Sequence, residues 1–238
     1  MTINVLMPVF ATPVEWVQEA VKSIIAQSYD EHNFIIVDDN NPRGALTDYL
    51  YSLTEVCHCI NIVRTKENKG IAAALNYGLQ FCHGDLIVRM DADDIARPDL
   101  LKRHNEFFTA HPDRHICGVQ IHLFNEITEW FSNHPSEITR ARAFAMPGHW
   151  FVNHPGIAFR MNTINKIGGY GATPSNLAED YALWVKFLCS GYSIYNQQEV
   201  LMDYRVHPKS FSFAPDRKSP EWHAFLKQQK DLLNEQRN

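Results

Sequence analysis

Residues 84–98 carry the pattern that most constrains this chain, which is a short apolar run that ends in a cluster of acids. The run spans residues 86–88, and Asp91, Asp93 and Asp94 follow it. An apolar run bounded by turn residues predicts a buried strand. Three carboxylates so close together repel one another unless a cation neutralises them, and hard divalent cations prefer oxygen ligands. A solvated acidic turn has the same kind of sequence, so this stretch alone is consistent with a cation site and with a surface turn.

A second acidic cluster follows an earlier strand pattern, because the apolar run at 34–37 leads directly into Asp38 and Asp39. Strand and helix patterns alternate along the first hundred or so residues, which predicts βαβ units and a parallel sheet. The carboxyl ends of parallel strands meet at one edge, where open α/β sheets bind their ligands. We therefore expect the two acidic clusters to lie at the same edge and to form part of a binding site.

The other periodic patterns predict the remaining elements of an α/β chain. We expect further strands over residues 3–7, 60–63 and 116–124, within 153–160 and within 193–204. We expect helices over residues 13–25, 45–56, 70–82, 100–108, 179–188 and 220–235. The first helix is predicted to begin with a capping box formed by Thr12 and Glu15. Residues 125–150 show no clear period, which is typical of a binding loop and equally of a surface excursion.

Composition excludes several functional classes. The net charge of −5 argues against a general nucleic-acid binder. No apolar run approaches the length of about 18 residues that a transmembrane helix needs, and the first residues lack the basic region of a signal peptide. The five cysteines are scattered, so we expect them to be reduced and buried. No Gly-x-Gly-x-x-Gly motif follows the first strand, which argues against dinucleotide binding.

Several short motifs occur in a fixed order along the chain. They are Met7-Pro8-Val9-Phe10, Val37-Asp38-Asp39, Asn68-Lys69-Gly70, Asn76-x-Gly78, Asp91-Ala92-Asp93-Asp94, Gly168-Gly169-Tyr170, Glu179-Asp180 and Tyr204-Arg205-x-His207. Each motif is weak alone, but the ordered set, over residues 3–212, resembles the family 2 glycosyltransferases. The resemblance implies the GT-A fold, which is a single α/β domain with a Rossmann-like, mostly parallel central sheet flanked by helices. It divides residues 1–214 into a nucleotide-sugar-binding half (1–98) and an acceptor-binding half (99–214), followed by a C-terminal helical tail (215–238).

The same resemblance implies an inverting transfer of a sugar from a UDP-sugar to a hydroxyl of a glycan acceptor. Asp39 looks like the acid that accepts a hydrogen bond from the base, with Asp38 supporting it. Asp91 looks like a contact to the ribose or the metal, and Asp93 like the direct ligand of Mn²⁺ or Mg²⁺. His207 matches a position that reaches the metal or the diphosphate in several members. The other implied donor contacts are Pro8, Val9, Phe10, Asn68, Gly70, Asn76 and Ala92.

Asp180 resembles the general base of the family, and its place at a helix start is expected to favour the ionised carboxylate. Glu179, His154 and Trp150 are the candidate contacts to the acceptor. Asp94 has no implied role beyond capping the turn that leads to Pro98. Most relatives build bacterial surface polysaccharide, which suggests a cytoplasmic enzyme that works at the inner face of the membrane as a peripheral protein.

Three alternatives stay open at this point. A polyprenyl-phosphate sugar transferase shares the fold, but its acceptor is already anionic and needs less help from a base. A nucleotidyltransferase would also use a metal and a nucleotide on an α/β sheet. A nucleotide-sugar-binding module that has lost catalysis would keep the donor residues without turnover. The sequence does not identify the sugar, the acceptor, the linkage or the oligomeric state.

Overall fold

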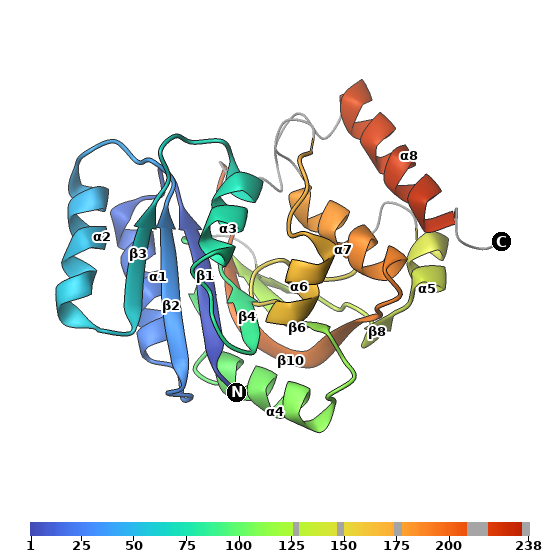
Figure 1. Cartoon of the computed structure of the whole chain (residues 1–238), viewed down its shortest axis with the longest axis horizontal. Helices are drawn as coiled ribbons and strands as arrows, with labels where there is room; N and C mark the ends of the chain where they lie inside the picture. The colour runs from blue at the N-terminus through green and yellow to red at the C-terminus, as the bar shows by residue number, and fades with distance from the viewer. Residues whose placement is uncertain (126–128, 147–149, 174–177, 209–218, 235–238) are drawn as a thin grey trace.

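A mixed central sheet with helices on both faces organises the chain (Figure 1). The computed structural model describes residues 1–125, 129–146, 150–173, 178–208 and 219–234. Its strands are β1 (Ile3–Val9), β2 (His32–Asp38), β3 (Ile60–Arg64), β4 (Leu86–Arg89), β5 (Ile95–Ala96), β6 (Ile116–Phe124), β7 (Glu129–Phe131), β8 (Glu137–Ile138), β9 (Ala158–Arg160) and β10 (Ile194–Arg205). Its helices are α1 (Val14–Ile25), α2 (Ala45–Val56), α3 (Ile71–Leu79), α4 (Leu100–Ala110), α5 (Arg140–Ala145), α6 (Met161–Ile167), α7 (Glu179–Cys189) and α8 (Pro220–Asn234).

The N-terminal half of the sheet is parallel, as the βαβ pattern predicts. Its strands lie in the order β3-β2-β1-β4, and each neighbouring pair is parallel. β1 sits between β2 and β4, with Val9 paired to Asp38 and Leu6 paired to Arg89. The carboxyl ends of β2 and β4 therefore flank the end of β1, and the acids that follow them lie at one edge.

The second half of the sheet is mixed. β9 runs antiparallel to both β4 and β6, and so joins the two halves. β10 pairs with β6 in parallel along most of its length and with β5 in antiparallel fashion. The pairing with β5 places the end of β10 beside the segment that follows Asp93 and Asp94. Residues far apart in the sequence thereby meet at the acidic edge.

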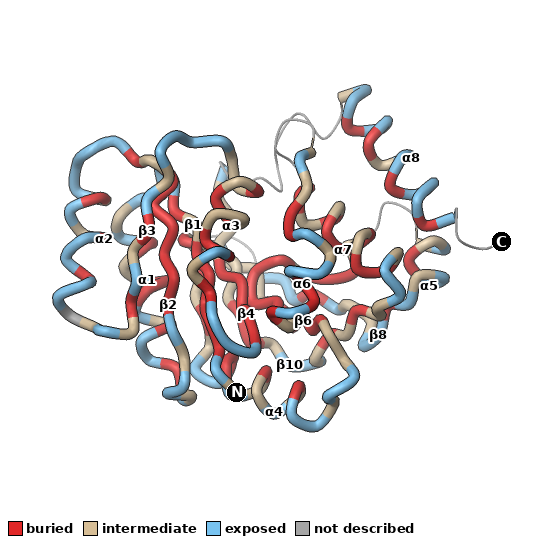
Figure 2. The backbone as a smooth tube through the Cα atoms, viewed as in Figure 1, coloured by how far each residue is buried: buried red, intermediate tan, exposed pale blue. Residues whose placement is uncertain are grey.

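Two hydrophobic clusters cover the two faces of the sheet. Helices α1, α2 and α4 belong to the cluster on one face, and α3, α5, α6 and α7 to the cluster on the other, where α8 packs on the outside of α5 and α7. β1 supplies both clusters by alternation, because Val5 and Met7 face the first cluster and Leu6 faces the second. Figure 2 shows the central strands buried along their length between exposed outer helix faces. α8 belongs to the second cluster through Trp222, Phe225 and Leu233.

α3 lies unusually close to the sheet, and glycine makes this approach possible. A Cβ atom built on Gly78 would lie 2.4 Å from Cδ1 of Leu6 and 2.6 Å from Cγ2 of Val37. Atoms cannot approach so closely without displacement, so any larger residue would push α3 away from β1 and β2. Gly78 thus fixes the helix that borders the acidic edge.

The predicted strands and longer helices are all present, with ends shifted by a few residues. The predicted capping box of α1 is wrong: Pro13 occupies the N-cap position without a side-chain cap, and the Thr12 hydroxyl donates to the carbonyl of Phe10 at 3.4 Å. The short elements β5, β7, β8, α5 and α6 were not predicted. They are too short for a periodic pattern to develop.

The cysteine prediction is partly wrong. Cys82 and Cys117 are reduced and buried as expected, and Cys189 is a reduced, half-buried thiol. Cys57 and Cys59 instead form a disulfide in the turn between α2 and β3, where their Cα atoms lie 5.3 Å apart. This separation lies within the range that a disulfide can bridge, and scattered spacing along the chain does not report it.

Candidate active site

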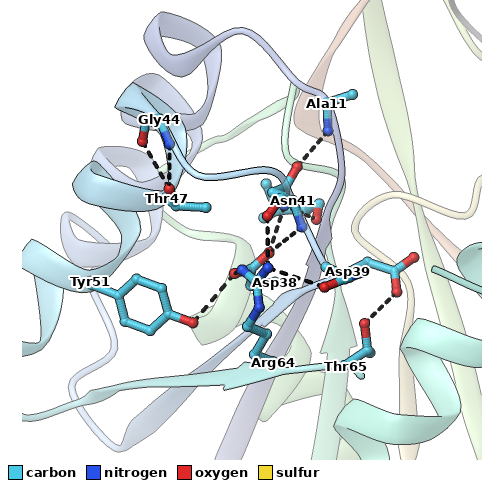
Figure 3. A network of polar contacts seen from close by, with 11 residues as sticks. Ala11, Asp38, Asp39, Asn41, Gly44, Thr47, Tyr51, Arg64 and Thr65 are labelled. Atoms are coloured by element: carbon cyan, nitrogen blue, oxygen red, sulfur yellow. Dashed lines mark hydrogen bonds and ion pairs between the residues drawn. The ribbon is translucent and has the colours of Figure 1, made fainter. Parts of the chain in front are cut away.

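Asp38 is the buried anchor of the loop that follows β2 (Figure 3). Its Oδ1 accepts hydrogen bonds from the backbone N–H of Asn41 at 2.9 Å and from the Asn41 side chain at 2.8 Å. Its Oδ2 forms an ion pair with Arg64, which extends from the end of β3. The carboxylate is fully buried, so the guanidinium offsets the cost of removing this charge from water. Asp38 therefore shapes the loop, and the neighbouring Asp39 is buried as well.

Asp39 points away from the arginine, toward Thr65 (Figure 3). Its Oδ1 accepts a hydrogen bond from the Thr65 hydroxyl at 2.8 Å. Burial raises the pKa of this carboxyl, and the nearby charge of Asp38 adds to the effect, while the Thr65 hydrogen bond opposes it. A carboxylate in this environment has a strong preference for an additional hydrogen-bond donor, such as an N–H of a nucleobase.

Backbone strain marks the borders of the site. Among the described residues, the non-glycine residues with left-handed φ angles are Ala11 (52°), Asn40 (59°) and Ala178 (57°). Ala11 follows Phe10, Asn40 follows Asp39, and Ala178 precedes Glu179. Such conformations cost roughly 1–2 kcal/mol each and concentrate at functional sites. Each strained residue is next to a residue that the sequence predicts to bind or react.

Asp91 is held by a buried arginine. Arg89, the last residue of β4, is 1% exposed, and its Nη1 forms an ion pair with Oδ2 of Asp91. The side chain of Asp91 is 25% exposed, so one side of the carboxylate faces solvent at the edge of the sheet. An arginine at the end of an otherwise apolar strand is the sequence signal for such an ion pair. The pairing of Arg89 with Asp91 was nevertheless not predicted.

Asp93 meets His207 from the other half of the chain. Oδ2 of Asp93 lies 2.9 Å from Nε2 of His207, and the backbone carbonyl of Asp93 accepts a hydrogen bond from Nε of Arg205 at 2.9 Å. The His207 ring packs on Trp16 of α1, with ring centroids 4.7 Å apart. The structure thus brings together Asp93 and His207, two of the three residues that the sequence predicts as metal contacts, and the third, Asp91, is paired with Arg89. Across the described ranges, no group of three or more His, Cys, Asp or Glu side chains could hold a metal ion.

Asp94 does not cap the turn before Pro98, so that prediction is wrong. The side chain is fully buried, and its Oδ1 accepts a hydrogen bond from the backbone N–H of Arg205 at 2.9 Å. Burial and the charges of Asp91 and Asp93 hold its pKa well above the ordinary value. Asp94 therefore ties the acidic turn to the end of β10, because the pairing of β5 with β10 brings the two segments together.

The remaining donor-site candidates lie around the same edge, in different states. Pro8 and Val9 are the last two residues of β1, and Ala92 is buried in the turn after β4. Phe10, in contrast, is 50% exposed. Asn68 accepts a hydrogen bond from the N–H of Gly70, which caps α3. Asn76 is committed to the protein, since both atoms of its amide pair with the backbone of Tyr170 at 2.9 Å. These two hydrogen bonds argue against a direct contact between the Asn76 side chain and a ligand.

Asp180 lies near the start of α7 with a hydrogen-bond donor on each oxygen. Oδ2 accepts from the indole N–H of Trp150 at 3.0 Å, and Oδ1 accepts from the backbone N–H of Tyr181 at 2.7 Å. The expectation that the helix start lowers the pKa is wrong. Burial and the neighbouring charge of Glu179 raise the pKa of this carboxyl, and they outweigh the two hydrogen bonds.

The three candidate acceptor contacts all gather around Asp180. Glu179 is buried, with Oε1 3.5 Å from Nδ1 of His154. The other ring nitrogen of His154 lies 2.9 Å from the hydroxyl of Tyr170. Burial and the charge of Arg89 lower the pKa of His154 to about 3, so its ring is neutral at physiological pH. His154 and Glu179 thus pair with each other beside Asp180, whereas Trp150 donates to the Asp180 carboxylate itself.

Sequence reasoning missed the residues that hold these acids in place. They are Trp16, Arg64, Thr65, Arg89, Tyr170, Arg205 and Trp222. Arg205 belongs to a motif that the sequence singled out, and its guanidinium also lies over the rings of Trp16 and Phe124. Tyr170 likewise belongs to the motif Gly168-Gly169-Tyr170. Apart from Arg89, the remaining residues gave no local signal, because each reaches its partner across the fold.

Comparisons with known proteins agree on one family. The family model described as glycosyl transferase family 2 matches residues 4–168. The chain is 32% identical over 206 residues to an Escherichia coli UDP-Gal:alpha-D-GlcNAc-diphosphoundecaprenol beta-1,3-galactosyltransferase, covering 85% of this chain and 73% of the relative. Asp180 and His207 lie beyond the segment that the family model matches.

Solved structures support the same fold. The crystal structure of Staphylococcus aureus TarS 1–349 in complex with UDP-GlcNAc superposes with a TM-score of 0.74 at 17% identity, over 98% of this chain and 66% of that one. The mannosyltransferase PcManGT from Pyrobaculum calidifontis, in complex with GDP-Man and Mn²⁺, gives 0.66 at 17% identity, over 97% and 69%. The GT-A fold predicted from the motifs is confirmed, and the chain belongs to glycosyl transferase family 2.

Proposed function

We propose that this glycosyltransferase moves a sugar from a UDP-sugar to a hydroxyl of a glycan acceptor with inversion at the anomeric carbon. One observation carries the proposal, which is that the acidic clusters after β2 and β4 flank the end of β1. Asp39 and Asp91 are both held by protein partners while a part of each cluster faces the edge. This arrangement suits a ligand that has a nucleobase at one end and a diphosphate at the other.

The donor would lie along this edge. Asp39 would accept a hydrogen bond from the N–H of uracil, and Phe10, exposed at the end of β1, would contact the nucleoside. Asp91 would contact the ribose or the metal. The E. coli relative uses UDP-Gal by its name, and the S. aureus structure contains UDP-GlcNAc, which both support a uridine donor.

A divalent cation fits the pair Asp93 and His207. A carboxylate oxygen and an imidazole nitrogen 2.9 Å apart can turn toward one ion, and this donor set suits Mn²⁺ and also Mg²⁺. Oxygens of the diphosphate would complete the ligand set, which is consistent with the absence of a three-residue cluster among the described residues. When bound, the cation would stabilise the negative charge that develops on the leaving nucleoside diphosphate. The Mn²⁺ and GDP-Man in the archaeal structure support this part of the proposal.

Asp180 would act as the general base. The acceptor hydroxyl oxygen forms a bond to the anomeric carbon, the bond from that carbon to the diphosphate breaks, and the hydroxyl proton passes to Asp180. Each oxygen of Asp180 accepts one hydrogen bond and keeps a lone pair for this proton. A raised pKa suits the role, because a base works best when its pKa approaches the operating pH.

The acceptor would approach from the side of α7, where Trp150, His154 and Glu179 surround the base. The acceptor in the name of the E. coli relative is a sugar on a lipid diphosphate, which supports a lipid-linked glycan here and a place in polysaccharide biosynthesis. We therefore propose that the enzyme works at the inner face of the cytoplasmic membrane. No helix of the described part of the chain is long and apolar enough to span a membrane.

Calorimetry or thermal shift with a panel of nucleotide-sugars, each with and without Mn²⁺, tests the donor assignment. A ligand that binds only the folded state raises the melting temperature of the protein, by an amount that grows with the logarithm of the ligand concentration relative to its Kd. We expect UDP-sugars to bind, and Mn²⁺ to strengthen their binding. Tighter binding of a nucleoside triphosphate, or of GDP-sugars, would overturn the uridine assignment. Product analysis with a lipid phosphate as the acceptor would identify a polyprenyl-phosphate transferase instead.

A further inference from the structure

Trp150 has a single polar atom, and the structure directs it at Asp180. The indole N–H is a donor only, and it lies 3.0 Å from Oδ2 of the carboxylate. Hydrogen bonds to ionised groups are the strong ones, so this contact favours the ionised, proton-accepting form. It also fixes the direction of the carboxylate, because the second oxygen accepts from the backbone N–H of Tyr181.

The Trp150 ring is held by aromatic neighbours from two helices. Its centroid lies 5.2 Å from that of Tyr181 on α7 and 6.2 Å from that of Trp222 on α8, where the two indole planes are stacked at 12°. Trp222 is 7% exposed and also packs on Phe225 of α8, with centroids 6.1 Å apart. Rings packed in this way restrict the rotamer of Trp150, and with it the direction of the N–H.

α8 is capped locally at its start and anchored to α5 at its end. At its start, the backbone N–H of Trp222 donates to Oγ of Ser219 at 3.1 Å. At its end, Nε of Arg140 on α5 donates to the carbonyl of Leu233 at 2.8 Å, and Nη2 donates to the carbonyl of Leu232. A cation on the last carbonyls of a helix satisfies unpaired acceptors and complements the helix dipole. Arg140 therefore docks α8 in one position, with Trp222 over Trp150.

We propose that α8 is part of the catalytic apparatus, in which Trp222 holds Trp150 so that its indole N–H orients the Asp180 carboxylate. Trp150 and Trp222 are positioning residues that act through Asp180. This inference rests on the proposed function, because it takes Asp180 as the base. It also gives Trp150 a role different from the acceptor contact that the sequence predicts.

Other charged and titratable groups also face Asp180, and they stay in place when Trp150 or Trp222 is changed. They are Glu179 on α7, His154 before β9, Tyr170 after α6 and, through these, Arg89 on β4. Because they are common to the wild type and the variants, a shift in the pH profile of a Trp150 variant reports the loss of the indole N–H.

Trp150→Phe tests the hydrogen bond while it keeps an aromatic ring. We expect kcat to fall about tenfold to a hundredfold, as for loss of a hydrogen bond to a charged group. The acidic limb of the pH profile should move to higher pH, because the pKa of Asp180 rises without the donor. Affinity for UDP and the KM for the donor should not change. An unchanged kcat and pH profile with a raised KM for the acceptor would overturn the proposal and make Trp150 an acceptor contact.

Trp222→Leu tests the support from α8. We expect a shift of the pH profile in the same direction and a smaller fall in kcat, and the double variant should be no slower than Trp150→Phe alone, since both act on one group. Leu50→Ala is the matched control, because Leu50 is fully buried on α2, in the hydrophobic cluster on the opposite face of the sheet. It should lower the melting temperature and leave the pH profile unchanged. A profile that moves equally in Leu50→Ala, or additive effects in the double variant, would contradict the role of Trp222.

Asp180→Asn separates this inference from the proposed function. If that variant keeps near wild-type turnover, Asp180 is not the base and the proposed function fails. If it loses turnover while Trp150→Phe behaves as the wild type at every pH, the proposed function stands and the inference about α8 fails.

Discussion

The acids after the strands and the acid on α7 are held by different chemistry. On the strand side, Asp38 pairs with Arg64 and Asp91 with Arg89, and Asp93 lies against His207. On the α7 side, no ion pair involves Asp180 among the described residues, and its donors are the neutral N–H groups of Trp150 and the backbone. Burial raises the pKa of Asp180, and its two neutral donors oppose this rise only in part. On the proposed roles, the difference separates the acids that bind the donor from the acid that takes the proton.

Asp39 and Asp94 are the exceptions on the strand side, because neither forms an ion pair among the described residues and the pKa of each is raised. The partner of Asp39 is the Thr65 hydroxyl, whose hydrogen bond opposes the effect of burial on the pKa. A carboxylate that is to accept a hydrogen bond from a nucleobase must keep a lone pair exposed, which a bidentate arginine would occupy. Along the same edge, Asp38 and Asp91 are therefore held by arginines, whereas Asp39 is held by a neutral hydroxyl.

Arg64→Met should have the largest effect on stability. It leaves the fully buried Asp38 without its cation, and an uncompensated buried charge costs about 3 kcal/mol in the free energy of unfolding. Urea denaturation measures this loss. Lys69→Met is the matched control, since the exposed pair of Lys69 with Glu67 is screened by solvent and contributes little to stability. Equal losses in the two variants would show that Asp38 does not depend on its arginine.

Asp93→Asn should weaken donor binding only when a divalent cation is present. Loss of a metal ligand is expected to raise the Kd for the UDP-sugar in Mn²⁺ at least about tenfold, or about 1.4 kcal/mol, with little change in its absence. Asp85→Asn serves as the control, because Asp85 lies at the opposite end of β4 and accepts from the N–H of Thr2. Calorimetry with both variants gives the answer, and an equal loss without Mn²⁺ would argue against a metal ligand at this position.

Asp180→Asn should change the pH dependence of stability in a defined direction. Because the folded-state pKa is raised, wild-type stability is complete below the unfolded pKa and falls as the pH rises through the folded pKa. The asparagine variant lacks this loss, so its free energy of unfolding should increase relative to that of the wild type over the same range. Chemical denaturation at a series of pH values measures the difference. A difference that does not change with pH would mean that Asp180 ionises without cost.

Ala178→Gly should have the smallest effect and should stabilise the protein. The left-handed φ of Ala178 is relieved by glycine, and the greater freedom of the unfolded chain offsets part of the gain, leaving about 0.5 kcal/mol. Ala182→Gly inside α7 is the control with the opposite sign, costing about 1 kcal/mol. Thermal unfolding compares the two. Destabilisation by Ala178→Gly would show that no strain is stored beside the base.

The parallel half of the fold and the acidic edge could be predicted because their signals are local. The runs at residues 3–7 and 34–37 alternate with amphipathic helices, and the acids follow the strands directly in sequence. Chain order then places Asp38 and Asp91 at one edge without any knowledge of side-chain contacts.

The partners of these acids could not be predicted, because they come from distant segments. Trp150 reaches Asp180 across 30 residues, and Arg205 reaches Asp94 across 111. No period or spacing reports such pairs. The prediction for the pKa of Asp180 failed for the same reason. The helix start can be read from the sequence, but the burial that outweighs it cannot. The close packing of α8 on α7 likewise depends on tertiary contacts of Trp222.

We propose that the acids after the strands bind the donor and that Asp180 takes the proton. The most direct test of this assignment is to measure donor binding and turnover of the Asp180→Asn variant with one UDP-sugar in Mn²⁺. We predict that the variant binds the donor with wild-type affinity and that transfer falls by roughly 10²–10⁴-fold, the contribution of a general base. Loss of donor binding would place Asp180 in the donor site. Near wild-type transfer would show that the base is another residue.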